Sequence, residues 1–264
     1  MLDLIFLGLL IFFVAFFMIM VGKGGGNFYL LILVFSGISM HEASATGQFI
    51  LFSASLAGLI VYNRDKKINW KIFVIIGSMI SISAFFGGFL SSHFDSAFLK
   101  IIFAILLMIS GILMLIPLKS SKFNETVHRG HIAIRTGDET IYMNMIAIIP
   151  ITIFTGFFSG MIGISGGSFI VPLLVLACKI PMKESVATAT PLIALSAFMG
   201  WTGHLFTGHF DLFFSLPLSI IAIIGGILGG KVALKSKPKY LKQLFALTNW
   251  LAAIIMIINL MITS

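Results

Sequence analysis

Two glycine-rich motifs in this 264-residue chain could bind an anion through the backbone. Residues 22–28 read GKGGGNF, and residues 163–169 read GISGGSF. Glycine lets a chain turn sharply and approach a ligand closely. Asn27 and Ser168 suit the N-cap position, so a helix beginning there would direct free N–H groups and a positive dipole end at the loop. The alternative interpretation is that these glycines only permit close helix packing.

A pair of hydroxyl-rich motifs follows the glycine motifs. Residues 42–48 read EASATGQ, and residues 184–190 read ESVATAT. Their side chains can donate hydrogen bonds to an anion, or they can bond neighbouring helices at about 0.6 kcal/mol per pair. Together the motifs give the candidate substrate-binding residues Lys23, Gly24, Gly25, Gly26, Asn27, Thr46, Gln48, Ser165, Gly166, Gly167, Ser168, Thr188 and Thr190.

Lys23 stands where the second glycine motif has Ile164. A lysine deep in a membrane needs an anionic partner or a water-filled cavity. Alternatively, the loop lies at the cytoplasmic interface and Lys23 extends into the headgroups. His204 and His209 flank a polar loop; histidine can couple protons, but we interpret both as solvated residues at the membrane surface. The histidines show no metal-ligand spacing, and we predict neither a metal nor a cofactor.

The composition places the chain in a membrane. Hydrophobic residues make up 59% and charged residues 10% of the sequence, with a mean hydropathy of +1.11. Soluble domains contain about 45–50% apolar and about 25% charged residues. These values exclude a soluble enzyme and a nucleic-acid-binding protein, so the lipid bilayer must solvate the chain. The single cysteine, Cys178, excludes an internal disulfide.

The apolar segments fall into two sets of five, and the fold class they predict is an all-α integral membrane protein with 8–10 transmembrane segments. The second segment of each set has only about 11–12 residues, or roughly 17 Å of helix, and is a half-helix or one arm of a re-entrant hairpin. The segments are 3–21, 27–38, 43–62, 71–91 and 96–117, then 146–162, 168–178, 185–203, 212–230 and 241–262.

The two sets are internal repeats. The glycine motifs lie 141 residues apart, and after one added residue an offset of 142 aligns Gly58 with Gly200 and residues 87–88 with 229–230. Such a constant register indicates duplication. We predict a first repeat over residues 1–117, a central cytoplasmic loop over 118–145 and a second repeat over 146–264.

Loop charges predict that the repeats are inserted in opposite orientations. Basic residues cluster in the segments 64–71, 119–135 and 231–242, whereas the equivalent loops of the other repeat lack such clusters. Cytoplasmic loops carry the excess of lysine and arginine. This rule places the three clusters inside and both termini outside a bacterial inner membrane.

At these motifs the sequence resembles the TauE/SafE sulfite exporter family, also called the 4-toluene sulfonate uptake permease family. The resemblance is carried by residues 156–167 (GFFSGMIGISGG), 171–174 (VPLL) and 187–190 (ATAT). It implies an inner-membrane carrier of sulfur-containing anions, such as sulfite or organosulfonates, with export driven by the proton gradient. Ser165 replaces a glycine common in the family, and Leu31 stands where the second repeat has a proline.

Inverted repeats are typical of secondary transporters, which bind substrate where discontinuous helices from both halves meet. We therefore expect a secondary-active anion transporter that works as an exporter, with protons as the coupling ion and no enzymatic activity. A passive anion channel and an intramembrane enzyme are the alternatives. The expected partners are a small anion, protons and the lipid bilayer; homodimerisation stays open, and nucleic acid is excluded.

Overall fold

The computed structural model describes residues 2–115, 131–136, 139–164, 166–206, 208 and 210–263. It confirms the prediction of an all-α membrane protein, since among these residues five helices are long and apolar enough to cross a bilayer. The elements of the first half are α1 (Leu2–Met20), α2 (Gly26–Phe35), α3 (Met40–Arg64), α4 (Trp70–Leu90), the 3-10 turn η1 (Ser91–His93) and α5 (Ser96–Leu115).

A β-hairpin precedes the second set of helices. Strands β1 (His131–Thr136) and β2 (Glu139–Asn144) pair antiparallel inside the segment that we predicted as a loop. The helical elements that follow are α6 (Met145–Ile162), α7 (Gly167–Pro172), the π-helix η2 (Leu173–Ala177), α8 (Met182–Leu205), α9 (Leu212–Lys235) and α10 (Pro238–Thr263).

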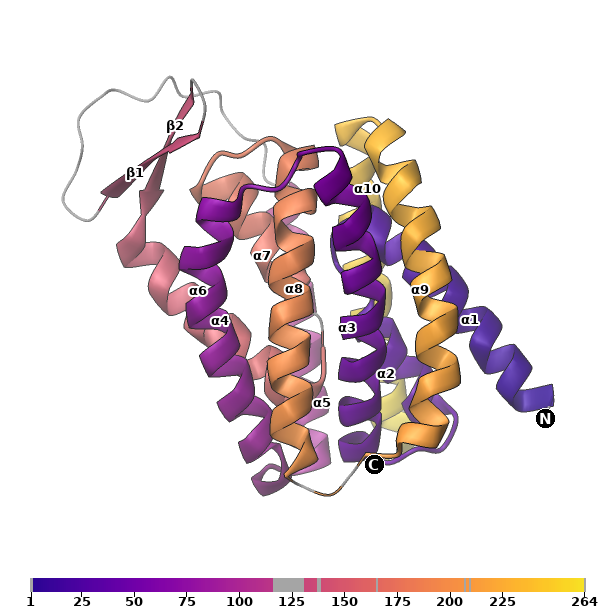
Figure 1. Ribbon diagram of the computed structural model, residues 1–264. Coiled ribbons are helices and arrows are strands. Elements are labelled where there is room, and N and C mark those ends of the chain that lie inside the picture. Colours follow the sequence, from indigo (N-terminus) through magenta and orange to yellow (C-terminus); the bar gives the residue numbers. More distant parts are fainter. Residues whose placement is uncertain are drawn as a thin grey trace.

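The helices pack so that each half contacts the other along its length. Helices α3 and α8 lie side by side in the middle of Figure 1, with α4 against α8 and α9 against α3. Helix α1 packs on α9, and α6 packs on α4, while α5 and α10 pair behind them. Each of these interfaces therefore joins a helix of the first half to a helix of the second half.

Glycines bring these backbones into contact. A Cβ atom at Gly87 of α4 would clash with the Phe157 carbonyl of α6, and one at Gly229 of α9 would clash with the Phe16 carbonyl of α1. Small residues at helix crossings give the close van der Waals packing that drives association in lipid. These two contacts are equivalent in the repeat, because its offsets align Gly87 with Gly229 and Phe16 with Phe157.

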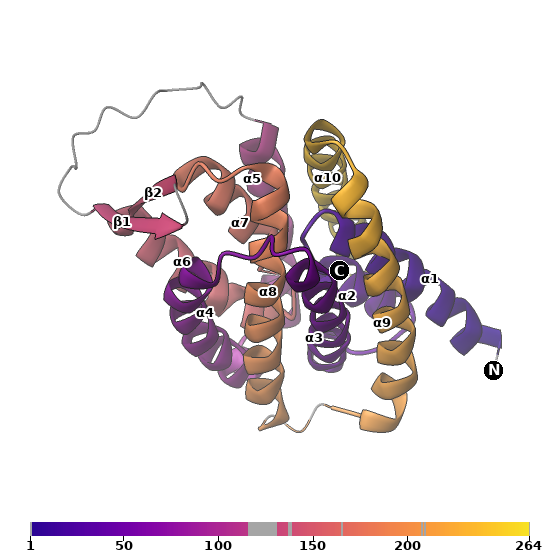
Figure 2. The same cartoon turned by 45° about the horizontal axis from the view of Figure 1, so that its top comes forward.

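The two ends of the bundle differ in the segments they carry. The hairpin, the loop from α3 to α4 and the loop from α9 to α10 lie at the upper end of Figure 1, and the loop from α8 to α9 lies at the lower end. Figure 2 shows the hairpin beside the bundle rather than within it. Both chain termini lie toward the lower part of Figure 1.

Candidate functional site

The first glycine motif forms a turn inside the bundle. Helix α1 reaches the last turn of α3, where Tyr62 Oη donates to the Ile19 carbonyl at 2.9 Å. The chain then reverses through Gly24 and Gly25, whose φ angles of 74° and 103° are ones that side-chain-bearing residues rarely adopt. Helix α2 runs back toward the end where α3 begins, so α1 and α2 form a hairpin.

The second glycine motif meets the first one inside the bundle. A Cβ atom at Gly167 would lie 2.8 Å from the Gly22 carbonyl oxygen and 2.9 Å from Lys23 Cα. Asn27 Nδ2 donates to Ser168 Oγ at 2.9 Å, and these two residues are equivalent under the 141-residue offset. The predicted N-caps are wrong, because Gly25 and Gly166 occupy those positions and the two side chains bond each other instead.

Helices α5 and α10 extend this contact into a buried polar network. Ser168 Oγ donates to Asn249 Oδ1 at 3.2 Å, and Asn249 Nδ2 donates to Ser110 Oγ at 2.8 Å. Ser110 Oγ in turn donates to the Ser168 carbonyl. Each of these side chains is at most 1% exposed. Buried polar groups are normally satisfied in this way, and the network fixes where α2 and α7 begin.

Lys23 is part of this buried region, and not of a membrane surface. Its side chain is 1% exposed, Nζ donates to Thr248 Oγ1 at 2.9 Å, and the ammonium lies 4.9 Å from the centre of the Phe245 ring. The side chain therefore lies inside the protein and does not extend into the headgroups, as the alternative interpretation required. A buried ammonium is costly, and in membrane proteins such residues mark substrate or ion pathways.

Two unsatisfied hydroxyls lie beside the first glycine turn. Tyr29 Oη and Ser55 Oγ are buried and have no hydrogen-bond partner among the described residues. A Cβ atom at Gly25 would lie 2.9 Å from Tyr29 Oη, and one at Gly24 would lie 2.8 Å from Ser55 Oγ. Leaving a buried hydroxyl unsatisfied costs about 1–3 kcal/mol. Both hydroxyls are thus available to a ligand that reaches this turn.

The hydroxyl-rich motifs are only partly brought to this site. Gln48 Nε2 donates to the Ser159 carbonyl at 2.8 Å, and Thr190 Oγ1 donates within its own helix to the Val186 carbonyl at 2.9 Å. Thr46 Oγ1 accepts from Ser215 of α9, whereas Thr188 Oγ1 accepts from the Asn69 amide at the beginning of α4. These two threonines therefore hold neighbouring helices at opposite ends of the bundle.

The remaining predicted residues divide as follows. Gly26 begins α2, and Gly166 precedes α7 as its N-cap. Ser165 lies outside the described residues, as does His209. The interpretation of His204 as a solvated residue is wrong: α8 continues to Leu205, and the His204 side chain is 0% exposed.

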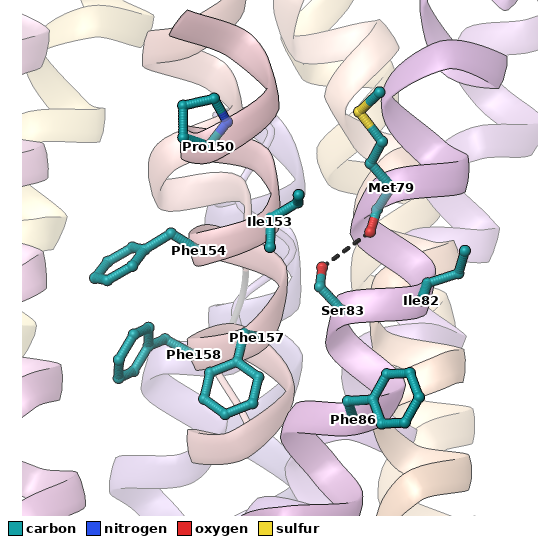
Figure 3. A pocket seen from close by; sticks show the side chains of 9 residues that line it. All are labelled: Met79, Ile82, Ser83, Phe86, Pro150, Ile153, Phe154, Phe157 and Phe158. Carbon is teal, nitrogen blue, oxygen red and sulfur yellow. Dashed lines mark hydrogen bonds between the residues drawn. The ribbon is translucent and has the colours of Figure 1, made fainter. Parts of the chain in front are cut away.

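An apolar groove between α4 and α6 is a poor anion site. Its volume is about 740 Å³, and Figure 3 shows that phenylalanine, isoleucine, methionine and proline side chains line it. Its single hydroxyl, Ser83 Oγ, donates to the Met79 carbonyl at 2.9 Å. Ile82 and Phe86 are more than half exposed, so the groove opens on the outer face of the bundle. A dissolved anion would lose its hydration there and gain no donor.

Comparison with known proteins agrees with a transport function. The sequence profile of the family Sulfite exporter TauE/SafE matches residues 7–256. A probable membrane transporter protein of Methanocaldococcus jannaschii is 30% identical over 237 residues, which are 84% of this chain and 83% of that protein. The probable membrane transporter YunE of Bacillus subtilis is 27% identical over 212 residues, covering 78% of this chain and 77% of its own length.

A third similar protein is YdhB of Bacillus subtilis, also a probable membrane transporter, which is 27% identical over 90% of this chain and 93% of its own length. No solved structure matches the chain. The family profile covers nearly all of the sequence, and these relatives cover most of it. The chain belongs to the TauE/SafE sulfite exporter family of membrane transporters.

Proposed function

We propose that this protein is a secondary-active carrier that exports small sulfur-containing anions, such as sulfite or organosulfonates, and binds them between the two glycine turns. The observation that carries the proposal is the position of Lys23. Its ammonium lies at the junction of both turns with α10, 1% exposed. A lysine placed there supplies the positive charge that a desolvated anion requires.

The groups around Lys23 match the chemistry of a sulfur oxyanion. The oxygens of sulfite and sulfonates accept several hydrogen bonds, and the Lys23 ammonium and the Tyr29 and Ser55 hydroxyls are donors. The N–H groups at the beginnings of α2 and α7 add backbone donors and two positive dipole ends. Helices α2, α5, α7 and α10 contain no aspartate or glutamate, so an anion meets no like charge from them.

Equivalent contacts in the two halves support an inverted-repeat arrangement. Asn27 and Ser168, which the repeat aligns, bond each other directly. Gly22 lies against Val186, with a Cβ contact of 2.8 Å, and the corresponding Gly163 lies against Ser44. A pair of aligned residues in mutual contact is expected on a two-fold axis between the halves. Rocking of such halves about a central site gives alternating access.

The arrangement of the two glycine turns fits an occluded state of an alternating-access cycle. Asn27, Ser168 and Asn249 are at most 1% exposed, and the Gly167 backbone touches Gly22 and Lys23. An anion reaches these donors only if the turns separate. In the proposed cycle, separation toward one end of the bundle opens the site to one side of the membrane at a time, and the proton gradient drives net export.

Reconstitution in proteoliposomes tests the carrier proposal. We expect vesicles loaded with unlabelled sulfite or sulfoacetate to accumulate the labelled anion transiently, because a carrier exchanges one bound molecule for another. A channel dissipates gradients without such counterflow. Protein-free vesicles are the control for leakage. Absence of counterflow with sulfite and with several organosulfonates would reject the proposed function.

The proposed topology has its own test. A reporter fused after Ser264 is expected to behave as periplasmic, and one inserted at Lys66, in the loop between α3 and α4, as cytoplasmic. The basis is that the basic loops mark the inner side of the membrane. Cysteine labelling from outside intact cells at the same two positions provides an independent readout. A cytoplasmic C-terminus would contradict the inverted five-plus-five arrangement.

A further inference from the structure

The His204 side chain joins three elements at a point where their backbones are in close contact. Its Nε2 lies 2.9 Å from the Gly160 carbonyl oxygen of α6, and its Nδ1 lies 3.1 Å from Ser91 Oγ of η1. One turn away, a Cβ atom at Gly200 of α8 would lie 3.2 Å from Gly160 Cα. The ring is 0% exposed, so bulk water does not solvate it.

This geometry can accommodate both protonation states of the ring. A carbonyl oxygen only accepts, so Nε2 must carry a hydrogen in either state. In the neutral ring Nδ1 accepts from the Ser91 hydroxyl. In the imidazolium Nδ1 donates to Ser91 Oγ, and the Ser91 hydroxyl donates to the Gly88 carbonyl, 2.7 Å away. Rotation of one hydroxyl hydrogen therefore satisfies the site before and after proton binding.

The first half contains the same helix contact without the titratable ring. The repeat offsets align His204 with Tyr62 and Gly160 with Ile19, and Tyr62 Oη donates to the Ile19 carbonyl at 2.9 Å. Ser91 aligns with Ala233, which has no hydroxyl. A phenol is sufficient to hold this turn in the first half. Holding the two helices together therefore does not require a histidine. The combination of His204 and Ser91 adds a group that can bind a proton, as histidine does near neutral pH.

The residue that His204 holds leads directly into the second glycine turn. Gly160 follows Ser159, whose carbonyl accepts from Gln48 Nε2 at 2.8 Å and whose hydroxyl donates to the Ile164 carbonyl at 3.0 Å. A hydrogen bond from an imidazolium is roughly twice as strong as one from a neutral ring. Protonation therefore strengthens the attachment of α6 to α8, and proton release weakens it.

We propose that His204 is the proton-binding residue that couples the proton gradient to movement of α6 and its glycine turn; this rests on the carrier function proposed above. Helix α6 contains no titratable residue, and Lys71 of α4 and Lys183 and Glu184 of α8 lie in the first turns of their helices, at the other end of the bundle. Among the residues whose side chains the structure describes, the charged or titratable groups toward the same end as His204 are His41 and Glu42 in the first turn of α3, His93 of η1, and Asp95 and Asp211 in the loops after η1 and α8.

Transport by His204→Gln separates proton coupling from carrier function. Glutamine can donate a hydrogen bond to the Gly160 carbonyl, but its amide does not take up a proton. We expect H204Q vesicles to retain sulfoacetate counterflow at equal pH and to lose accumulation driven by an imposed pH gradient. Tyr62→Phe, the matched variant of the first half, should keep the pH-gradient response. Wild-type accumulation by a folded H204Q protein would overturn the proposal.

A second measurement does not depend on the transported anion. In ¹⁵N-histidine-labelled protein, we expect the resonances absent from H204Q to change from one to two protonated nitrogens between about pH 8 and pH 5. Ser91→Ala should move that change to lower pH, because it removes the acceptor of the second N–H. A ring that keeps one protonated nitrogen throughout would overturn the proposal, whether or not sulfoacetate is transported. Absent counterflow with a titrating ring would reject only the carrier function.

Discussion

Lys23→Met is expected to weaken anion binding by about 10- to 100-fold while leaving the protein folded. Hydrogen bonds to charged groups contribute about 1.5–3 kcal/mol, and each 1.4 kcal/mol corresponds to a tenfold change in affinity. Methionine fills a similar volume without a charge. Thr248 keeps its bonds to the Leu244 and Phe245 carbonyls, at 2.8 and 3.0 Å, so its hydroxyl stays satisfied.

The measurement is the concentration of sulfite or sulfoacetate that protects the purified protein against thermal unfolding, together with counterflow at the same concentrations. Lys67→Met is the matched control, because Lys67 is exposed in the loop between α3 and α4. The control should bind as the wild type does. Unchanged anion affinity in Lys23→Met would contradict a direct role for this lysine.

Gly167→Ala is expected to abolish transport by separating the two turns. The added methyl group would clash with Ile193 and meet the Gly22 carbonyl oxygen at 2.8 Å. Adding a methyl group to a well-packed core costs about 1–3 kcal/mol. Alanine is otherwise favoured over glycine in a helix by about 1 kcal/mol, so the close contacts with Ile193 and with the first glycine turn make this substitution unfavourable.

Gly47→Ala provides the matched comparison for that variant. Gly47 is also a helical glycine, but a Cβ atom there would lie 3.7 Å from its nearest neighbours, an ordinary contact. We expect Gly47→Ala to transport normally and to be as thermally stable as the wild type or slightly more so. Equal counterflow rates in Gly167→Ala and Gly47→Ala would show that the close approach of the turns is dispensable for transport.

Helix positions were largely predictable because apolar length and glycine register are local properties of the sequence. The short segment after each glycine motif predicted either a half-helix or a re-entrant arm, and α2 forms the second arm of a hairpin inside the bundle. The charge of residues 118–145 predicts only a loop and not the β-hairpin, although Ile132 and Ile134 lie two residues apart, as apolar residues on one face of a strand do.

The candidate site was predictable only where a motif repeats. Lys23, Asn27 and Ser168 were found because the two halves align, and the structure brings them together with α10. Ser110 and Asn249 carry no motif, because an isolated polar residue in an apolar helix does not reveal which helix faces it. These two residues are 139 positions apart in the sequence, and they meet only because α5 packs on α10.

The sequence mispredicts the surroundings of His204 for a related reason. The apolar segment 185–203 ends one residue before the histidine, whereas α8 continues to Leu205. A polar residue at the end of a helix looks solvated until its neighbours are known, and here Ser91 and Gly160 enclose it. The alignment of His204 with Tyr62 was already present in the repeat and could have indicated an inward-facing position.

The most direct test of the central claim is to locate the bound anion in a structure of the protein with selenite. Selenite has the charge and shape of sulfite, and selenium identifies itself by anomalous scattering. We predict a selenium peak between Gly25 and Gly167, with a selenite oxygen within hydrogen-bond distance of Lys23 Nζ. Peaks confined to the exposed lysines of the loops, with none near Lys23 in a protein that transports sulfite, would contradict the proposed site.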